Sequence, residues 1–205
     1  MAVIRRVVYT DLPGQAKNLR ETGRTINEKM VKLYESIGAM SSNWYGVRYN
    51  ELVDAFNKMT VDFNSILELV YTKIPSTIET IAENYRRVDN PNSPTFAVDT
   101  SSHNKLQDIR KSEQVGMKFE SAQVESVKEE CNSLLAQVLD YLNDVEGQIG
   151  RLSWESDASD AFRAEFDKLK RNIFESISNV KQQFDTSMAQ TLQDMQSAET
   201  ANTVG

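Results

Sequence analysis

Hydrophobic residues recur every three or four positions through most of this chain, which is the spacing of one face of an α-helix. Two long runs follow the two tryptophans, Trp44 and Trp154. The first run comprises Leu52, Phe56, Met59, Phe63, Leu67, Val70, Ile74, Ile78, Ile81 and Tyr85, and the second comprises Phe162, Phe166, Leu169, Ile173, Ile177, Val180, Phe184, Met188, Leu192 and Met195. The second repeats the first at an offset of 110 residues, with a one-residue slip only at Ile81 and Leu192. The shared register predicts an internal repeat.

A further periodic run precedes each tryptophan. These runs are Leu19, Ile26, Met30, Leu33, Ile37 and Met40 in the first copy, and Cys131, Val138, Leu142, Val145, Ile149 and Leu152 in the second. Their offset is 112 residues, and the turn before Trp44 absorbs the difference. Each copy therefore reads as a helix, a short turn at the tryptophan and a second helix. Because one hairpin cannot bury such wide stripes alone, we predict an all-α fold of two tandem antiparallel helical hairpins forming a pseudo-dimeric four-helix bundle.

Local signals set the limits of these helices. Asp11 and Pro13 predict a helix start near residue 12, and Gly46 and Ser156 occupy equivalent positions before each second helix, where both residue types suit an N-cap. Pro75 lies inside a continuous apolar register, which predicts a kink and not a helix end. Mid-stripe positions in both copies are expected to be buried, namely Phe56, Leu67, Val70, Phe166, Ile177 and Val180.

The segment with Asn90, Pro91 and Pro94 terminates the first copy and divides the chain. We expect a first hairpin over 1–89, a linker over 90–116, and a second hairpin with a flexible C-terminal tail over 117–205. Leu106, Ile109 and Val115 could alternatively begin a helix within 102–116. An antiparallel pairing of the hairpins needs a linker that returns mostly extended. A continuous helix there would instead put both turns at one end or leave the hairpins to pair with other chains.

Composition excludes several classes of function. A net charge of −7 argues against nucleic acid as a partner. No apolar stretch is long enough to span a membrane, and Arg5 and Arg6 interrupt the apolar N-terminus, so we expect neither a membrane span nor a cleavable signal peptide. Cys131 lies on an apolar stripe and is expected to be a small buried residue.

Candidate catalytic chemistry is sparse in this sequence. His103 is the only histidine, lies next to the linker and is expected to be solvated. Without a second histidine, a di-iron bundle site of the Glu-x-x-His type is excluded, and neither Cys/His metal spacing nor a glycine-rich phosphate loop occurs. We expect a non-enzymatic protein without metal or cofactor.

Trp44-Tyr45-Gly46 between two amphipathic helices, with Tyr85 and Asp89 after the second helix, resembles the WXG superfamily of small, ESAT-like type VII secretion proteins. The resemblance covers roughly residues 12–89 and 117–199. In that family a Trp-x-Gly turn joins the two helices, and a Tyr-x-x-x-Asp/Glu motif acts in export. The resemblance therefore implies a turn motif at Trp44 and Gly46 and a secretion signal at Tyr85 and Asp89.

The second copy departs from the family pattern. Ser156 follows Trp154 where the pattern has glycine, and Met195 with Glu199 stands where the signal would have tyrosine. Family members usually dimerise as single hairpins, whereas this chain resembles two fused hairpins. The resemblance thus implies that the second copy keeps the turn motif, Trp154 and Ser156, and lacks an export signal of its own.

Three functions are compatible with these features. The first is a secreted type VII substrate or co-secreted partner, cytoplasmic before export and extracellular afterwards, which meets an FtsK-like ATPase and acts through a helical partner or as a homodimer. Such a protein could be associated with virulence. The second is a cytosolic adaptor for a larger helical substrate, and the third is a structural bundle without an export role. The tryptophans themselves are expected first of all to plug the bundle ends as core residues, and this role is compatible with a docking surface at those ends.

Overall fold

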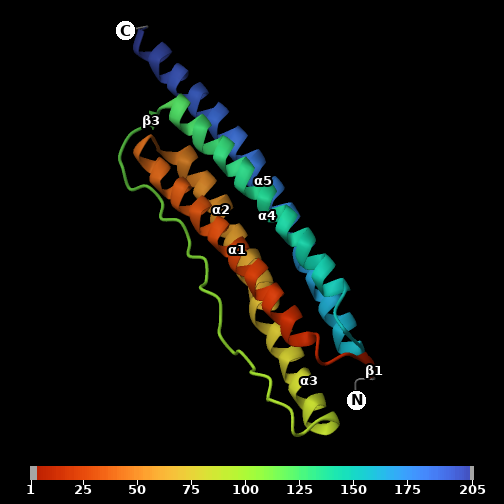
Figure 1. Cartoon of the computed structure of the whole chain (residues 1–205). Coiled ribbons are helices and arrows are strands. Elements are labelled where there is room, and N and C mark those ends of the chain that lie inside the picture. The colour runs from red at the N-terminus through yellow and green to blue at the C-terminus, as the bar shows by residue number, and fades with distance from the viewer. Residues whose placement is uncertain (1–3, 204–205) are drawn as a thin grey trace.

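The computed structural model describes residues 4–203, and helices make up 76% of them, which confirms a mostly helical chain. The elements in order are β1 (Ile4–Val7), α1 (Leu12–Ala39), the 3-10 helix η1 (Met40–Ser42), β2 (Trp44–Tyr45), α2 (Val47–Leu67), the π-helix η2 (Glu68–Lys73), α3 (Ile74–Asp89), β3 (Lys118–Phe119), α4 (Ser121–Gly150), β4 (Trp154–Ser156) and α5 (Asp157–Thr203) (Figure 1). The predicted starts are confirmed, since α1 begins at Leu12 and the second helices follow Gly46 and Ser156 directly.

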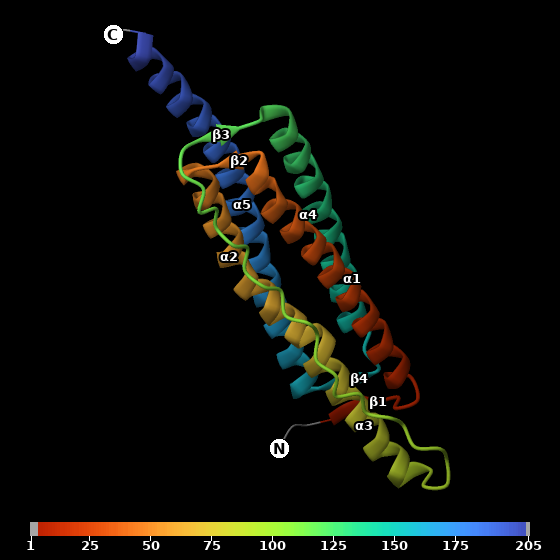
Figure 2. The same cartoon turned by 90° about the vertical axis from the view of Figure 1, so that its left-hand side faces the viewer.

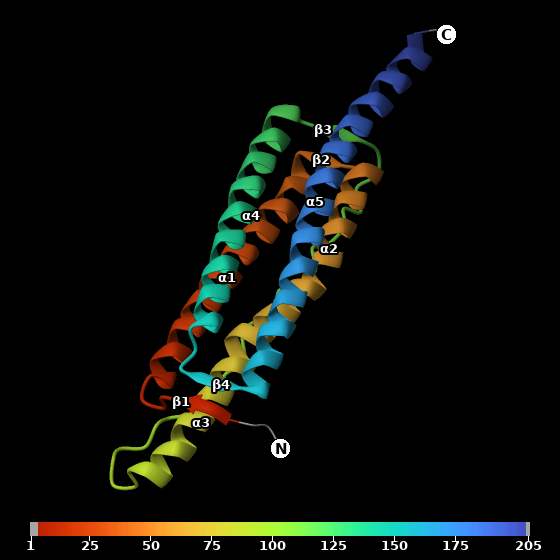
Figure 3. The same ribbon diagram turned by 90° about the vertical axis from the view of Figure 1, so that its right-hand side faces the viewer.

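The long helices pack most extensively across the two hairpins. Helix α2 lies along α5, and α1 lies along both α4 and α3, whereas α1 and α2 contact each other much less (Figures 2 and 3). Helix α3 extends beyond the other helices at one end of the molecule, and the last part of α5 extends beyond them at the other. Helix α5 continues to Thr203. Residues 204–205, the end of the predicted flexible tail, lie outside the described residues. Residues 1–3, the start of the segment for which no signal peptide is expected, also lie outside them.

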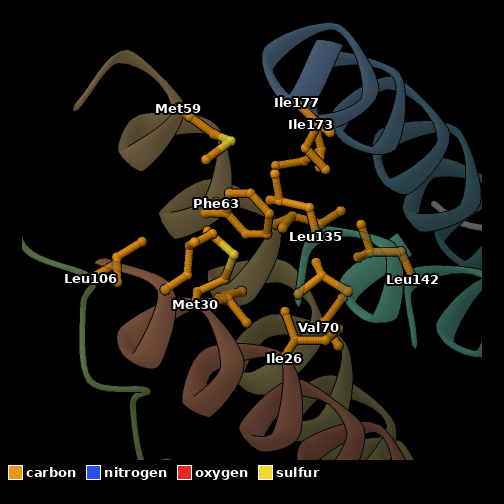
Figure 4. Packing of buried hydrophobic residues seen from close by; sticks show 14 of the residues in the cluster. Ile26, Met30, Met59, Phe63, Val70, Leu106, Leu135, Leu142, Ile173 and Ile177 are labelled. Atoms are coloured by element: carbon orange, nitrogen blue, oxygen red, sulfur yellow. The ribbon is translucent and has the colours of Figure 1, made fainter. Parts of the chain in front are cut away.

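One hydrophobic core runs through the interior between these helices. All six mid-stripe residues predicted to be buried are at most 3% exposed. Figure 4 shows side chains from both hairpins meeting there, with Met30, Phe63 and Val70 from the first hairpin near Leu135 and Ile173 from the second. Cys131 belongs to the same cluster, as predicted, and burial raises the pKa of its thiol to about 12.

The π-helix η2 changes the register before Pro75. The amide of Ile74 donates to the carbonyl of Leu69, five residues back, so the chain passes Pro75 without needing the hydrogen bond that proline cannot make. The wider turn rotates the positions that follow, and Ala82 is buried while Tyr85 is 36% exposed. Tyr85, the last residue of the apolar run that follows Trp44, is therefore not a core position.

The linker returns along the first hairpin as an extended chain and contains no helix (Figures 1 and 2). We call residues 95–117 the strap. Its buried side chains are three residues apart, at His103, Leu106 and Ile109, whereas Val115 is 98% exposed. A period of three is typical of an extended, polyproline-II-like chain with one side facing a surface. The expectation of a solvated His103 is wrong, because this period turns its side chain into the groove of the hairpin.

Candidate functional site

The two tryptophan turns lie at opposite ends of the molecule, and a short antiparallel strand pairs with each of them. Trp44 in β2 pairs with Phe119 in β3, and Trp154 in β4 pairs with Val7 in β1 (Figure 3). Each turn is thus held by the segment that precedes the first helix of the other hairpin. Sequence periodicity gave no sign of these strands, which contain only two to four residues each.

Trp44 is fully buried against α5. Its indole Nε1 donates to the Thr191 hydroxyl at 3.2 Å, and its ring packs near Phe184 and edge-on to Phe119. Next to it, Gly46 has φ of 121°, a left-handed conformation that favours glycine. A side chain at Gly46 would also meet the carbonyl oxygen of Gly116 at 3.4 Å. The backbone path of this turn therefore favours glycine at position 46.

The second turn achieves the same path without glycine. Ser156 has no positive φ, and its amide and side chain exchange hydrogen bonds with Ser159 at 2.9 and 3.1 Å, which caps α5. Trp154 is 3% exposed, and its indole Nε1 has no hydrogen-bond partner. Both tryptophans plug the ends of the core, so neither indole is available as a contact surface.

Tyr85 and Asp89 lie in the last turn of α3, at the same end of the molecule as β1 and β4 (Figure 2). Tyr85 is partly exposed, and Asp89 accepts a hydrogen bond from the Tyr9 hydroxyl at 2.6 Å. Tyr9 follows β1, which in turn pairs with the Trp154 turn. Asp89 of the predicted secretion signal is therefore connected to the second turn through the N-terminal segment.

Two buried charged residues lie beside this end, and the apolar periodicity of the sequence did not predict them. Glu83 and Arg86 are at most 6% exposed, and Arg86 donates to Glu83 at 2.7 Å and to the Ser93 carbonyl at 2.8 Å. The backbone amide of Phe96 also donates to Glu83. Arg86 and this amide hold the pKa of the Glu83 carboxyl well below its usual value. The pair anchors the start of the linker on α3.

A second buried pair anchors the strap one helical turn further along. Arg20 on α1 and Glu79 on α3 form an ion pair, with a second contact at 2.9 Å. Arg20 also donates to the backbone carbonyl of Asp99, while the Asp99 amide donates to Glu79 at 2.8 Å. The guanidinium and the carboxylate together satisfy both backbone groups of one strap residue. Neither residue carried a sequence signal, because the partner lies far away in the chain.

Three asparagines on α2 hold the rest of the strap, and we call them the asparagine ladder. Asn50, Asn57 and Asn64 each bind both the amide and the carbonyl of one strap residue, at 2.8 to 3.1 Å. Their strap partners are Ser112, Ile109 and Leu106, respectively. Asparagine is a poor helix former, so three asparagines at a seven-residue spacing on a predicted helix are the sequence feature that points to this ladder.

The described residues hold no cluster of histidine, cysteine and acidic side chains suited to a metal ion. Over the same part of the chain, none of the helices is long and apolar enough to cross a membrane.

A hollow of about 300 Å³ lies beside the Trp44 turn, between Gly116, Met117 and the Thr191 side of α5. It contains one cation, Arg48, which is paired with Asp194 and Glu51.

No family model, curated protein or solved structure matches the chain.

Proposed function

We propose that this chain is a non-enzymatic substrate or co-secreted partner of a type VII secretion system, exported folded and acting by protein–protein interaction. The observation that carries the proposal is that Tyr85 and Asp89 lie at the same end of the molecule as the Trp154 turn (Figure 2), to which Asp89 is linked through the Tyr9–Asp89 hydrogen bond and the β1–β4 pair. A two-part surface of this kind resembles the export signal of paired WXG-like hairpins.

We further propose that the two hairpins form a pseudo-dimeric, antiparallel four-helix bundle. The strand pairs support this symmetry, because the partner of Trp154 is Val7 and the partner of Trp44 is Phe119. Val7 and Phe119 are 112 residues apart, the same offset that relates the helices before each tryptophan. Equivalent residues of the two copies thus make equivalent contacts, as in a symmetric dimer.

The proposed signal is asymmetric between the two ends. At the Trp154 end, Tyr85 offers a partly exposed aromatic ring, whereas the equivalent residue at the Trp44 end is Met195. Because both tryptophans are buried, their part in export would be to shape the turn. The exposed part of the signal is then Tyr85 with Asp89, which we propose to contact the FtsK-like ATPase of the secretion machinery.

Export of substituted chains tests this function. In a bacterium with an active type VII system, Tyr85→Ala should abolish the intact chain in culture supernatant while the lysate level stays unchanged. Tyr85 is only partly buried, so its truncation should leave the helical circular dichroism spectrum intact. Val88→Ala, on the same helix and 86% exposed, and Met195→Ala are the matched controls and should be exported normally.

A cytosolic adaptor is the second candidate, because apolar side chains are exposed at the Trp44 end. Val47 is 71% exposed, and Met117 and Leu192 are each 46% exposed, which suits a helical partner. An adaptor would stay in the lysate and increase the export of another protein. Export of the Tyr85→Ala chain at the normal level would refute the signal and favour a structural bundle.

A further inference from the structure

The strap lies in a groove of the first hairpin, and the contacts of its backbone with the asparagine ladder do not depend on its side-chain sequence. Each ladder asparagine offers an amide donor and an acceptor to the two backbone groups of one strap residue, as a neighbouring β-strand would. Any extended chain without proline at these positions presents the same backbone groups. Sequence preference at the groove then comes from the side chains at every third position and from Lys111, which pairs with Asp54 on α2 at 2.8 Å.

The spacing of the ladder fits an extended chain closely. Seven residues of helix rise about 10.5 Å at 1.5 Å per residue. Three residues of extended chain rise about 9.3 to 10.2 Å. Asn50, Asn57 and Asn64 therefore stay in step with Ser112, Ile109 and Leu106. One further heptad leads to Tyr71, whose ring lies near His103, three residues before Leu106.

The second hairpin lacks these features, which shows that the hairpin fold does not require them. At the 110-residue offset, the ladder positions are Asp160, Asp167 and Phe174. A carboxylate cannot donate to a backbone carbonyl, and Phe174 is 44% exposed. The ladder is therefore a specific property of the first copy.

The linker does not need the groove to connect the hairpins. The chain between Asp89 and Ser121 can span about 100 Å when extended, whereas the helical path from Val47 to Asp89 is about 63 Å long. This surplus lets the strap leave the ladder while α4 stays in place. Most strap residues are exposed, and the apolar side chains buried between His103 and Ser112 are only Leu106 and Ile109, so release of residues 103–112 uncovers little core.

The strap is also an imperfect occupant of this groove. His103 is buried, yet Nδ1 and Nε2 of its imidazole both lack a hydrogen-bond partner, and Nδ1 lies 3.7 Å from the Glu68 carboxylate. A buried polar group without a partner weakens the docked state. An apolar side chain at this position would fill the same pocket without leaving polar atoms unpaired. A segment with leucine in place of His103 should therefore bind the groove more tightly than the strap does.

We propose that this groove is a binding site for an extended segment of another polypeptide, with apolar side chains at three positions spaced three residues apart. The strap is the intramolecular competitor of that segment. The asparagine ladder binds the backbone of the incoming segment. The pockets now filled by His103, Leu106 and Ile109 select its side chains. This inference is independent of any export role.

A labelled peptide tests the site directly. The probe has the sequence of residues 101–114 with His103→Leu and a fluorescein label, and the host is the full chain with Leu106→Asp and Ile109→Asp, which charge the strap and free the groove. We expect saturable binding by fluorescence anisotropy. The native chain should bind at least about tenfold more weakly, because its strap competes.

Two controls separate ladder recognition from general stickiness. Adding Asn57→Ala to the freed host should weaken binding about tenfold or more, since two backbone hydrogen bonds are lost while alanine favours the helix. A peptide of the same composition with apolar residues at alternate positions should not bind. A freed host that keeps its helical spectrum but does not bind the probe, or binds equally with Asn57→Ala, would overturn the proposal.

Hydrogen exchange of the native chain provides a measurement that does not depend on the freed host folding. Excess unlabelled probe peptide should accelerate exchange of the Leu106, Ile109 and Ser112 amides, because the displaced strap loses the asparagine side chains. The amides of α4 and α5 should be unaffected. Unchanged protection of the three strap amides at saturating peptide would also count against the site.

Discussion

At the scale of single residues, burial separates two phenylalanines of the same helix. Phe166 is 1% exposed in the core, whereas Phe174, eight positions further along α5, is 44% exposed beneath the Lys170 ammonium. Phe166→Ala should lower the free energy of unfolding by about 3 to 5 kcal/mol, because it removes a large side chain and leaves a cavity. Phe174→Ala should cost less than about 1 kcal/mol. Urea denaturation of both variants checks this, and equal midpoints would contradict the assigned stripe.

Charge is also decided residue by residue, and the outcome depends on what each group meets. Glu79 and Glu83 are buried because Arg20 and Arg86 pair with them and because strap amides fill the remaining acceptor sites. The same arginines bind strap carbonyls. These four side chains therefore serve the linker, and their burial is a consequence of its path.

At the scale of elements, the strap should respond to pH through His103. Burial lowers the pKa of His103 below its ordinary 6.5, while Glu68 partly opposes this and Lys105 adds to it. Arg24 and Glu28 face the same hollow. Well above pH 6.5 both docked and released forms are neutral at His103, so this group has no effect there. As pH falls below 6.5, the released form gains the proton more readily, and docking weakens.

Hydrogen exchange of the Leu106 and Ile109 amides measures this effect at about pH 7.5 and about pH 5.5, after correction for intrinsic exchange rates. Protection should fall at the lower pH in the native chain. In His103→Leu the pH dependence should disappear and protection should rise at both values. A pH dependence that persists in His103→Leu would assign the effect to another group.

The π-helix is a second element whose effect extends along the chain. By adding one residue to a turn, it moves Tyr85 out of the core stripe and brings Glu79, Glu83 and Arg86 into contact with the linker. The partial exposure of the tyrosine in the proposed signal thus depends on a backbone irregularity several turns earlier. Proline at position 75 suits this arrangement, because the wider turn already lacks the regular hydrogen bond.

At the scale of the whole molecule, the hairpins should unfold together. The most extensive contacts join α2 to α5 and α1 to α4, across the two copies, and β1 and β3 each cross to the other hairpin. Neither hairpin can keep its stripe buried alone. Differential scanning calorimetry should therefore give one transition with equal calorimetric and van't Hoff enthalpies. Two resolved transitions would show that the copies are separate folding units.

The sequence by itself determined the helices, the two tryptophan turns and the repeat that relates them. These features follow from the local spacing of apolar side chains and from residues such as Gly46 and Ser156 that suit a helix start. The buried positions Phe56 and Phe166 were predictable for the same reason. Each of these features depends on residues within a few helical turns along the chain, so the sequence alone is enough to predict it.

Only the tertiary structure decided the path of the strap and the surroundings of His103, Glu83 and the ladder asparagines. Leu106 and Ile109 fit the start of a helix as well as one side of an extended chain, so spacing alone left both open. The groove exists only after α1 and α2 have packed, and its polar side chains satisfy backbone groups more than forty residues away in the chain. The partners of a buried polar group depend on that packing, and local periodicity carries no record of it.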